Sequence, residues 1–523
     1  MKIFNIAVAL SAIALLCTAC NKDNGNRLPN EEEKAVTVPQ TLRLAIEKID
    51  DSSNKTKVGL SVDNDRARLK WNEGDKISSF WGDNDNHIYT YGTVMHNDGI
   101  EYTEFYHSDT KFKSETDGIK FDKTILYHPA DENLYCFWGQ NADGEILALK
   151  VELPDTREVW QEGRTGMEEM PMCSVIPLTE QIGKVKSAVG LIRLSIKGEL
   201  SLYDIRLTGN NNEPLAGTGY IYPLVNPNLI SLEHDLKYSL TLNCGNGREL
   251  NMATATDFYF IIPNDTHFSK GFTVEFRTGE GYITKRLSSE AYVPSNYILN
   301  MPEITLSIDD AEVAFEDDNF KAHMLGLADF DNNGVITLKE VRQWNESTTV
   351  SVNADGKKYL DLRNKGIQNL YGIYRFTALQ VLYCGNNGTE NANSIRNLPW
   401  FEKNGNIIEI DCSNLKSLEY LDTGYFPNII NLDCSNCSIK DLGLNSWSPK
   451  LTKLDCSGNK LKELDVSKTN IGNCPSSEPY ALKCANMQSL KTLTLKTGWD
   501  IKGITTNRST DYIPEATEIK FVD

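Results

Sequence analysis

The strongest constraint on the fold is a pattern that recurs in the last third of the chain. It occurs four times, as LQVLYCGNN (379–387), IIEIDCSN (407–414), IINLDCSN (429–436) and LTKLDCSGN (451–459). The cysteines of this register are separated by 28, 22, 22 and 28 residues, at Cys384, Cys412, Cys434, Cys456 and Cys484. One repeat of about 22 residues cannot bury a core alone, so the copies must stack and share one. The pattern predicts a solenoid over residues 350–523.

The spacing L-x-x-L-x-C-x-x-N is typical of a leucine-rich repeat, in which each turn places a short strand on a concave face and turns inward at the Asn. Residues 370–497 resemble bacterial leucine-rich repeats with D-C-S-x-N turns. The final residues, TEIKFVD, are expected to close the open end of the stack.

The concave face is predicted to carry a column of carboxylates with hydroxyls beside it. The members are Asp411, Asp433 and Asp455, with Ser413, Ser435 and Ser457. Strands on neighbouring turns lie about 4.8 Å apart, and like charges at that spacing repel unless something screens them. Either a protein or glycan ligand rich in hydroxyls or cations uses this column, or water alone screens it.

The chain contains 12 cysteines, which in an exported protein raises the question of disulfides. Five of them lie on the repeat register, at positions that Leu fills in similar arrays, so we expect buried thiols. The sequence CSNC (434–437) has the spacing of a redox or zinc motif. However, Cys456 aligns with Cys434 and Asn459 aligns with Cys437, and no second pair completes a zinc site.

An acidic loop precedes the repeats, in ADFDNNGVITLKEV (328–341). It fits the calcium-loop pattern D-x-[DN]-x-[DN]-G-x5-E at every position. The expected ligands are side-chain oxygens, one backbone carbonyl (Val335) and a closing bidentate carboxylate (Glu340), in the set Asp329, Asp331, Asn333, Val335, Thr337 and Glu340. Gly334 permits the sharp turn, and Ile336 should point into an apolar core.

Helices are expected on both sides of this loop, at 319–328 and 338–344. The unit, residues 311–349, resembles the single EF-hand that precedes repeat arrays in some bacterial surface lipoproteins. Sensors use pairs of such loops and only one complete loop is present, so we expect a structural Ca²⁺ that fixes the helices as a cap on the first repeat. The alternative is a solvated acidic turn that binds no ion.

Residues 38–308 are expected to be β-strands. TLRLAIEKI, LIRLSIKG, DFYFIIP and FTVEFR alternate apolar and polar residues, and Pro, Gly, Asn and Asp separate them at short intervals. The length predicts two β-sandwiches, 38–178 and 179–308. The expected fold class is therefore mainly β, with two tandem sandwiches, a helix-loop-helix and a short leucine-rich repeat solenoid.

The same region resembles the fimbrillin-like family of Gram-negative surface lipoproteins. The likeness is carried, in the family's order, by WNEGDKISSF (71–80), LPDT (153–156), EMPMCS (169–174), AVGLIRLSIKG (188–198), LAGTGYI (215–221), FYFIIPNDTHFSKGFTVEF (258–276) and YILNMPEI (297–304). The resemblance implies two transthyretin-like sandwiches and a role in adhesion or in fimbrial assembly by strand exchange.

The N-terminus indicates export and lipid anchoring. Residues 1–19 combine Lys2 with a short apolar run, which is typical of a signal peptide and too short to span a bilayer. LLCTACNKD resembles a bacterial lipoprotein box, which implies acylation of Cys20, and residues 20–37 are a polar tether. A plain secretory signal is the alternative. We expect a protein anchored in the outer membrane at the cell surface.

The remaining signals limit the function. A net charge of −19 without a Lys/Arg run argues against a nucleic-acid partner. Common catalytic motifs do not occur, so we expect no enzyme. The aromatic group Phe80, Trp81, Tyr89 and Tyr91 either stacks on sugar rings or belongs to a core. The sequence favours a surface adhesin or binding module, with a strand-exchanging fimbrial subunit (tip or minor) and a glycan-binding lipoprotein of a polysaccharide-utilisation system as alternatives.

Overall fold

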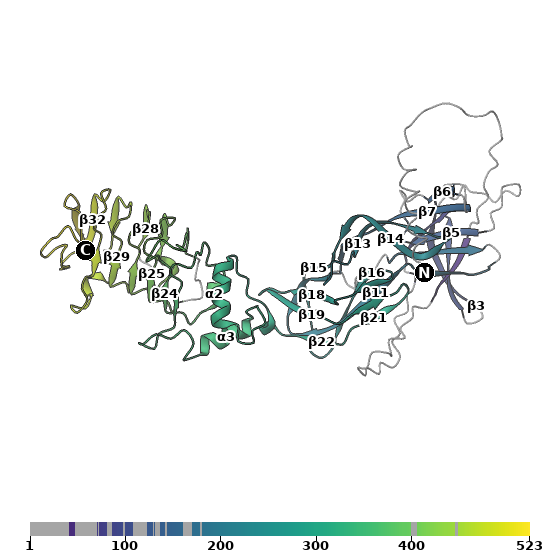
Figure 1. The fold of residues 1–523 in the computed structure, drawn as a ribbon, viewed down its shortest axis with the longest axis horizontal. Helices are drawn as coiled ribbons and strands as arrows, with labels where there is room; N and C mark the ends of the chain where they lie inside the picture. Colours follow the sequence, from purple (N-terminus) through teal and green to yellow (C-terminus); the bar gives the residue numbers. More distant parts are fainter. Residues whose placement is uncertain are drawn as a thin grey trace, which may run out of the picture.

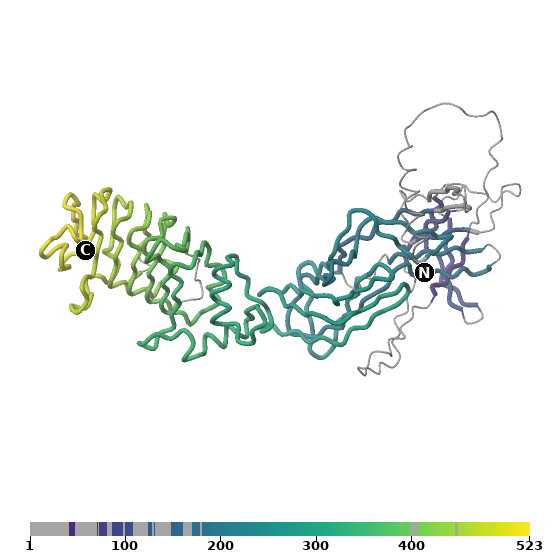
Figure 2. Tube along the Cα trace, in the orientation of Figure 1, coloured from purple at the N-terminus to yellow at the C-terminus, as the bar shows by residue number. Residues whose placement is uncertain are grey.

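The structure is a computed structural model. It describes residues 41–523 apart from 48–70, 72, 81–85, 98–99, 108–122, 129, 131–135, 142–143, 160–169, 178–179, 399–404 and 445–447. The described chain is elongated, with strands at one end, two helices in the middle and the repeats at the other end (Figures 1 and 2). It is mainly β, as predicted. Neither described helix has the length and hydropathy needed to span a bilayer.

The first body is a closed barrel of seven strands. Its order is β1 (Thr41–Ile46), β10 (Gly183–Ser187), β9 (Met172–Pro177), β5 (Lys123–His128), β2 (Lys76–Phe80), β3 (His87–Asn97) and β4 (Ile100–His107). β1 closes it by pairing in parallel with β10 and antiparallel with β4. Alternation along the strands turns the apolar side chains inward, among them Ile77, Phe80, Tyr89, Phe105 and Ile125.

The second body is a sandwich whose two sheets share one apolar core. One sheet contains β16 (Thr256–Pro263), β11 (Val189–Gly198), β21 (Ile298–Asn300) and β22 (Ile304–Leu306). The other contains β19 (Tyr282–Leu287), β18 (Phe272–Arg277), β12 (Ser201–Gly209), β15 (Ser239–Glu249) and β8 (Thr156–Glu158). Ile192, Leu194 and Ile196 of β11 alternate into this core, as the sequence predicts.

A further sheet joins the two bodies. It contains β14 (Asn226–Lys237), β13 (Ala216–Tyr222), β7 (Gly144–Leu153) and β6 (Cys136–Asn141), and β17 (Thr266–Phe268) pairs separately with β20 (Ala291–Val293). β7 and β8 therefore pair with strands of the later segment, whereas β10 completes the earlier barrel. The predicted boundary between residues 178 and 179 does not separate the sheets, and the expected first sandwich is a barrel in the described residues.

The helix-loop-helix follows β22 and a short 3₁₀ turn, η1 (Ile308–Asp310). Its helices are α2 (Asp318–Ala328) and α3 (Leu338–Glu346), within two residues of the predicted ranges. Asp317 caps α2 by accepting the Phe320 N–H (2.9 Å). Phe320, Met324 and Ala328 are spaced by four residues and form the buried stripe of α2.

The repeats form a solenoid with a six-stranded parallel sheet on its concave face. The strands, in order, are β23 (Tyr359–Asp361), β24 (Val381–Tyr383), β25 (Glu409–Asp411), β27 (Asn431–Asp433), β29 (Lys453–Asp455) and β31 (Leu482–Lys483). Smaller sheets pair β26 (Tyr420–Asp422) with β28 (Asp441–Gly443), and β30 (Glu463–Asp465) with β32 (Thr492–Lys496) and β33 (Glu518–Val522). The 3₁₀ turns are η2 (Ile373–Arg375), η3 (Thr423–Tyr425) and η4 (Ile471–Asn473).

The turn after each concave strand buries the residue three positions after the register Cys, where the pattern places the inward turn, as Leu415, Cys437 and Asn459 show. The residue before it has a left-handed backbone, with φ of 63° at Asn414 and 55° at Asn436. Asn tolerates that conformation better than most residues.

The five cysteines of the repeat register are free and buried, as predicted. Their thiols lie in the continuous core that also contains the cap helices. Cys437 donates its S–H to the Cys412 carbonyl (3.2 Å) of the neighbouring turn. Asn459, at the aligned position, bonds the carbonyls of Cys434 (2.8 Å) and Cys456 (2.9 Å). This equivalence supports a packing role for the C-x-x-C sequence.

Candidate functional site

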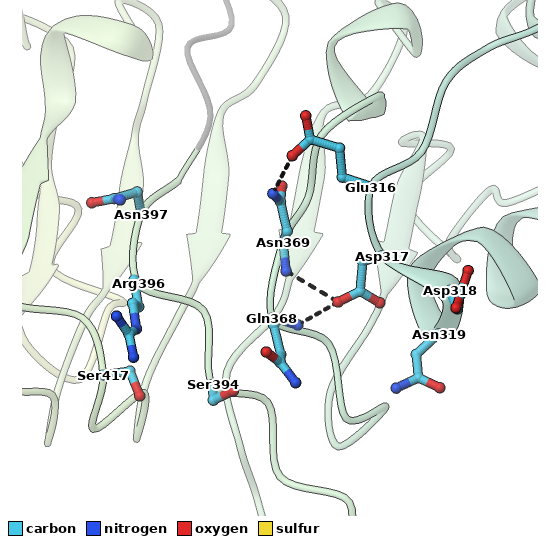
Figure 3. A pocket seen from close by; sticks show the side chains of 10 residues that line it. All are labelled: Glu316, Asp317, Asp318, Asn319, Gln368, Asn369, Ser394, Arg396, Asn397 and Ser417. Atoms are coloured by element: carbon cyan, nitrogen blue, oxygen red, sulfur yellow. Dashed lines mark hydrogen bonds between the residues drawn. The ribbon is translucent and has the colours of Figure 1, made fainter. Parts of the chain in front are cut away.

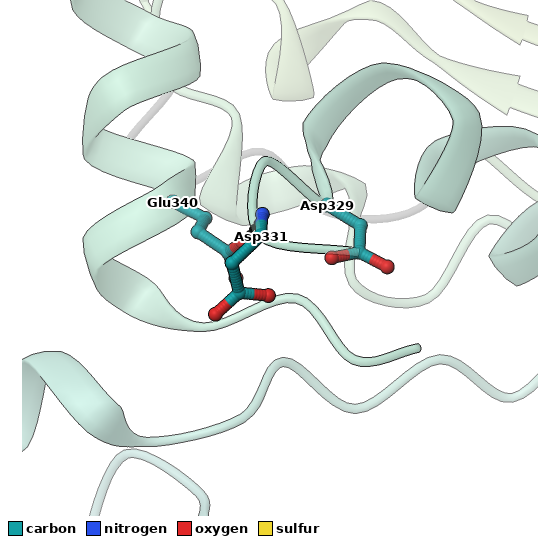
Figure 4. Close-up of side chains that lie close together, drawn as sticks. All are labelled: Asp329, Asp331 and Glu340. Atoms are coloured by element: carbon teal, nitrogen blue, oxygen red, sulfur yellow. Dashed lines mark hydrogen bonds between the residues drawn. The ribbon is translucent and has the colours of Figure 1, made fainter. Parts of the chain in front are cut away.

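The acidic loop between α2 and α3 brings three carboxylates together. One oxygen from each of Asp329, Asp331 and Glu340 lies within 4.8 Å of the others (Figure 4). In a Ca²⁺ site each oxygen is about 2.3–2.6 Å from the ion, so opposite ligands are about 5 Å apart. The spacing and the all-oxygen chemistry of these residues fit one calcium ion. Among the described residues, no other group of acidic, His or Cys side chains has metal-binding spacing.

Hydrogen bonds within the loop stabilise its turn conformation. Asp329 accepts the N–H groups of Asn333 (3.1 Å) and Gly334 (2.9 Å), and Asp331 accepts the Asn333 amide at Nδ2 (3.0 Å). Asn333 Oδ1 accepts the Val335 N–H (2.9 Å). Gly334 has φ of 86°, where a side chain would be strained even though space is available. The loop backbone therefore already follows the turn that the calcium pattern requires.

Glu340 both closes the loop and caps α3. Its Oε2 accepts the N–H and hydroxyl of Thr337 (both 2.9 Å), and its Oε1 accepts the Phe330 N–H (2.9 Å). Thr337 accepts the Glu340 N–H in return (3.3 Å), which completes a capping box. The side chain is only 5% exposed, so these donors replace the water that burial removes.

The loop also pairs with the segment that enters the helices. Ile336 is buried as predicted, and its carbonyl accepts the Val313 N–H (2.8 Å), while Leu338 donates to the Ala311 carbonyl (2.8 Å). On its other side the same segment bonds the sandwich, because Glu312 donates to the Tyr282 carbonyl of β19 (2.7 Å). The sequence does not indicate this pairing, because the three residues 311–313 have no distinctive composition.

Ion pairs reinforce the contact between sandwich and cap. Lys285 contacts Asp310 (3.0 Å), and Arg342 pairs with Asp309 through two hydrogen bonds. The guanidinium of Arg342 lowers the pKa of Asp309. Leu338 packs against both the sandwich core and the repeat core.

The cap is equally well attached to the first repeat. Lys358 is buried and donates to the carbonyls of Trp344 (2.6 Å) and Val350 (2.7 Å), and burial lowers its pKa. Trp344 packs edge-on against Phe376, with ring centroids 5.1 Å apart. The loop thus lies where the sandwich, the cap and the solenoid meet.

The predicted acidic column is present on the concave sheet. Asp411, Asp433 and Asp455 are in register on β25, β27 and β29. Each accepts the N–H of the Ser two residues later, at 2.9, 2.9 and 3.0 Å, and so shapes its own turn. The donors are the backbone N–H groups of Ser413, Ser435 and Ser457, and the Ser457 hydroxyl also accepts the Ala485 N–H (3.1 Å).

Aromatic and cationic side chains flank the acidic column. In the same register, Tyr383 precedes it and Lys483 follows it. Arg363 lies 5.0 Å from the Tyr383 ring centroid, and Lys483 lies 4.8 Å from that of Tyr480. The repeat pattern predicts that Tyr383 occupies the position of the Asp residues in the later turns. Tyr480 belongs to a longer insertion between two turns, and the repeat spacing does not predict its place.

The middle carboxylate of the column, Asp433, lies in an environment that disfavours its charged form. Burial raises the pKa of Asp433, and the carboxylates of Asp455 and Asp411 add to the rise, against hydrogen bonds from Ser435. Within the described residues, no ion pair reaches any of the three carboxylates. The three carboxylates therefore carry negative charge that no ion pair within the described residues neutralises. The opposite face of the sheet packs on the apolar core.

Two other predictions concern the N-terminal part. Phe80 and Tyr89 are buried in the barrel core, so the aromatic group is not a sugar-stacking platform there. Trp81 lies outside the described residues, as do the lipid-attachment residue Cys20, the signal peptide (1–19) and the tether (20–37).

No protein-family model matches the chain, and no curated protein matches it. Among solved structures, a "putative cell adhesion protein" from Bacteroides ovatus is 11% identical, with 52% of this chain and 93% of that chain covered and a TM-score of 0.30. The InlJ functional domain of Listeria monocytogenes, whose description includes a cysteine ladder, is 17% identical (35% and 55% covered, TM-score 0.13). Internalin C2 of the same species is 16% identical (40% and 94% covered, TM-score 0.18). Such distant likenesses carry no argument about this chain.

Proposed function

We propose that this protein is a surface-anchored adhesin or binding module that recognises a protein or glycan on the concave face of its repeat sheet. The acidic column is the observation that carries the proposal. Three carboxylates lie on neighbouring strands without an ion-pair partner among the described residues. A ligand with cationic or hydroxyl groups would relieve their repulsion and gain charge-assisted hydrogen bonds.

Calcium has a structural role in this proposal. Asp329, Asp331 and Glu340 would hold the ion, assisted by Asn333, Val335 and Thr337, and the ion would supply the charge that keeps the carboxylates together. The loop lies against Ala311–Val313, which also bonds the sandwich. A loop ordered by the ion would therefore fix the angle between the sandwich and the solenoid.

The anchor completes the proposal. Acyl chains on Cys20 would hold the protein in the outer membrane, and the barrel and sandwich would act as the stalk. The elongated arrangement in Figure 1, with the repeats farthest from β1, supports this reading.

Binding by the acidic column is tested with bacteria that display the full chain. Replacing Asp411, Asp433 and Asp455 by Asn keeps the oxygen that accepts each Ser N–H but removes the charge. We expect adhesion to mucin-coated and matrix-coated surfaces to fall at least about tenfold, which corresponds to about 1.4 kcal/mol. Adhesion is measured as bound cells per area at equal surface display.

Asp465→Asn is the matched control. Asp465 accepts the Ser467 N–H (2.9 Å) in the same kind of turn, but it lies on β30, outside the concave sheet. Equal adhesion of the triple variant and the unmodified strain would refute the concave-face proposal. In the same strains, Cys20→Ala should move the protein from the membrane fraction to the medium, and an unchanged membrane fraction would contradict acylation.

A further inference from the structure

A second, independent recess lies on the side of the solenoid, where the cap meets the first repeats. Its volume is about 770 Å³, within the range of small-molecule sites. The start of α2 and the residues before it form one wall, and the loops that follow β23, β24 and β25 form the other (Figure 3). The lining is polar throughout, and none of it belongs to the concave sheet that carries the acidic column.

Part of this lining builds the walls. Asp317 caps α2 and also accepts the N–H groups of Gln368 (2.7 Å) and Asn369 (3.2 Å) from the first repeat. The Asn369 amide donates to Glu316 (2.7 Å), and Asn319 donates to the Gly366 carbonyl (3.0 Å). These bonds fix the position of the α2 wall against the repeats, so the recess is preformed.

The other lining side chains have no hydrogen-bond partner within the described part of the chain. They are Asp318, Gln368, Ser394, Arg396, Asn397 and Ser417. Together they offer a guanidinium, a carboxylate, two amides and two hydroxyls. In Figure 3 they stand on both walls, with Arg396 on one side and Asp318 on the other. The recess thus has a cationic donor on one wall and an anionic acceptor on the other, and no carboxylate group there has metal-binding spacing.

An aromatic edge adjoins the polar recess. A smaller cavity of about 150 Å³ shares Asn397 with it and is lined by Tyr420 and Tyr425. Tyr420 is 45% exposed, and its hydroxyl donates to Asp422 (3.4 Å). A tyrosine ring has an apolar face that can pack on C–H groups while polar neighbours bond hydroxyls.

We propose that this recess binds an oligosaccharide, with Arg396, Asn397 and Asp318 bonding ring hydroxyls and Tyr420 packing on a sugar ring. A sugar presents closely spaced hydroxyls, each a donor and an acceptor, and an apolar face. The planar fork of Arg396 suits paired hydroxyls. All the residues that line the larger cavity are of polar types, which does not suit a hydrophobic ligand, and their mixed charge does not suit a polyanion or a polycation.

The test is affinity electrophoresis of the full chain, in detergent and calcium, through gels that contain xylan, mannan, pectin or gastric mucin. We expect at least one polysaccharide to retard the protein. Arg396→Ala and Tyr420→Ala should each weaken that interaction at least about tenfold, or about 1.4 kcal/mol, whereas Tyr420→Phe should retain it. Arg286→Ala and Tyr238→Ala are matched controls on the sandwich, since Arg286 is exposed and Tyr238 is 45% exposed. Melting curves verify that each variant folds.

Several outcomes would overturn the proposal. These are no retardation in any gel, retardation that neither Arg396→Ala nor Tyr420→Ala weakens, and retention by mucin that survives removal of its glycans, which would assign the recess to a peptide. Retardation lost only in the Asn variant of the acidic column would move sugar binding to the concave face. Because the recess and the column are changed separately, failure of one proposal leaves the other measurable.

Discussion

Asp433 has to satisfy two demands at once. Its Oδ1 accepts the Ser435 N–H and shapes the turn, while a carboxylate faces it from each neighbouring strand. Burial and the like charges of Asp455 and Asp411 raise its pKa. A carboxyl with a raised folded pKa favours folding below the unfolded pKa and loses that contribution as the pH rises through the folded pKa.

Asp433→Asn should therefore stabilise the protein at neutral pH. The amide keeps the turn acceptor and removes like-charge pairs that cost about 0.2–1 kcal/mol each. We expect a rise in melting temperature of about 1–4 °C at pH 7. The difference should disappear near pH 3, below the ordinary Asp value of 3.8. Scanning calorimetry from pH 3 to 8 measures it, and a variant that melts lower at pH 7 would contradict the repulsion argument.

At the scale of the element, five successive turns of the solenoid each place a buried thiol at the register position, which Leu362 occupies in the first turn. Burial raises the pKa of Cys484 to about 12, and it raises the pKa values of Cys412, Cys434 and Cys456 well above their usual range. Thiolate is the reactive form. The raised pKa values and the burial of the thiols therefore both protect the five register cysteines from modification.

Alkylation of the native protein at pH 8 should therefore discriminate among the cysteines. Cys474 is partly exposed and should react with iodoacetamide first, while the five thiols of the repeat register stay unmodified until denaturant is added. Peptide mapping by mass spectrometry reports each site. Equal labelling of Cys474 and of the five register cysteines in the native state would mean that the repeats unfold locally and often.

Elements differ in how far the sequence determines them. The repeat strands and the loop at Asp329–Glu340 were predictable, because their residues are contiguous and each position has one physical duty. The boundary at residue 178 was not, since β10 completes a barrel that begins at β1 and β7 pairs with β13. Pairing over such separations depends on the whole chain, and alternation within one strand does not name its partner.

The same limit applies to the sites. The acidic column follows from the repeat register, whereas the recess beside α2 combines four separate segments that only the folded cap brings together. Tyr480 likewise reaches the column from an insertion between two turns. The carboxylates that the acidic loop brings together could be named from the sequence, but the segment Ala311–Val313 that pairs with the loop could not.

For the whole molecule, removal of calcium is the decisive measurement. If the loop binds with the roughly 10⁻⁴–10⁻³ M affinity of extracellular modules, 10 mM Ca²⁺ should stabilise the cap by about 1.4–2.7 kcal/mol. That should raise the melting temperature of the repeat part by several degrees, and chelator should remove the gain. Small-angle scattering should also report a wider distribution of lengths without the ion.

Asp329→Asn combined with Asp331→Asn should abolish the response to calcium. Asp355→Asn is the matched control, because Asp355 is exposed and lies in a turn outside the loop. A repeat part that melts at the same temperature with calcium and with chelator would show that the loop is only an acidic turn.

The segment Ala311–Val313 gives the joint a mechanical character. Gly281 lies so close to it that an added Cβ would be 2.4 Å from the Glu312 carbonyl oxygen, so sandwich and segment fit without a gap. A cell held by its repeats in flowing fluid would transmit the drag to its membrane through these few backbone bonds. A calcium ion that stabilises the adjacent loop, Asp329–Glu340, would make the strength of attachment to a surface depend on the calcium concentration of the surroundings.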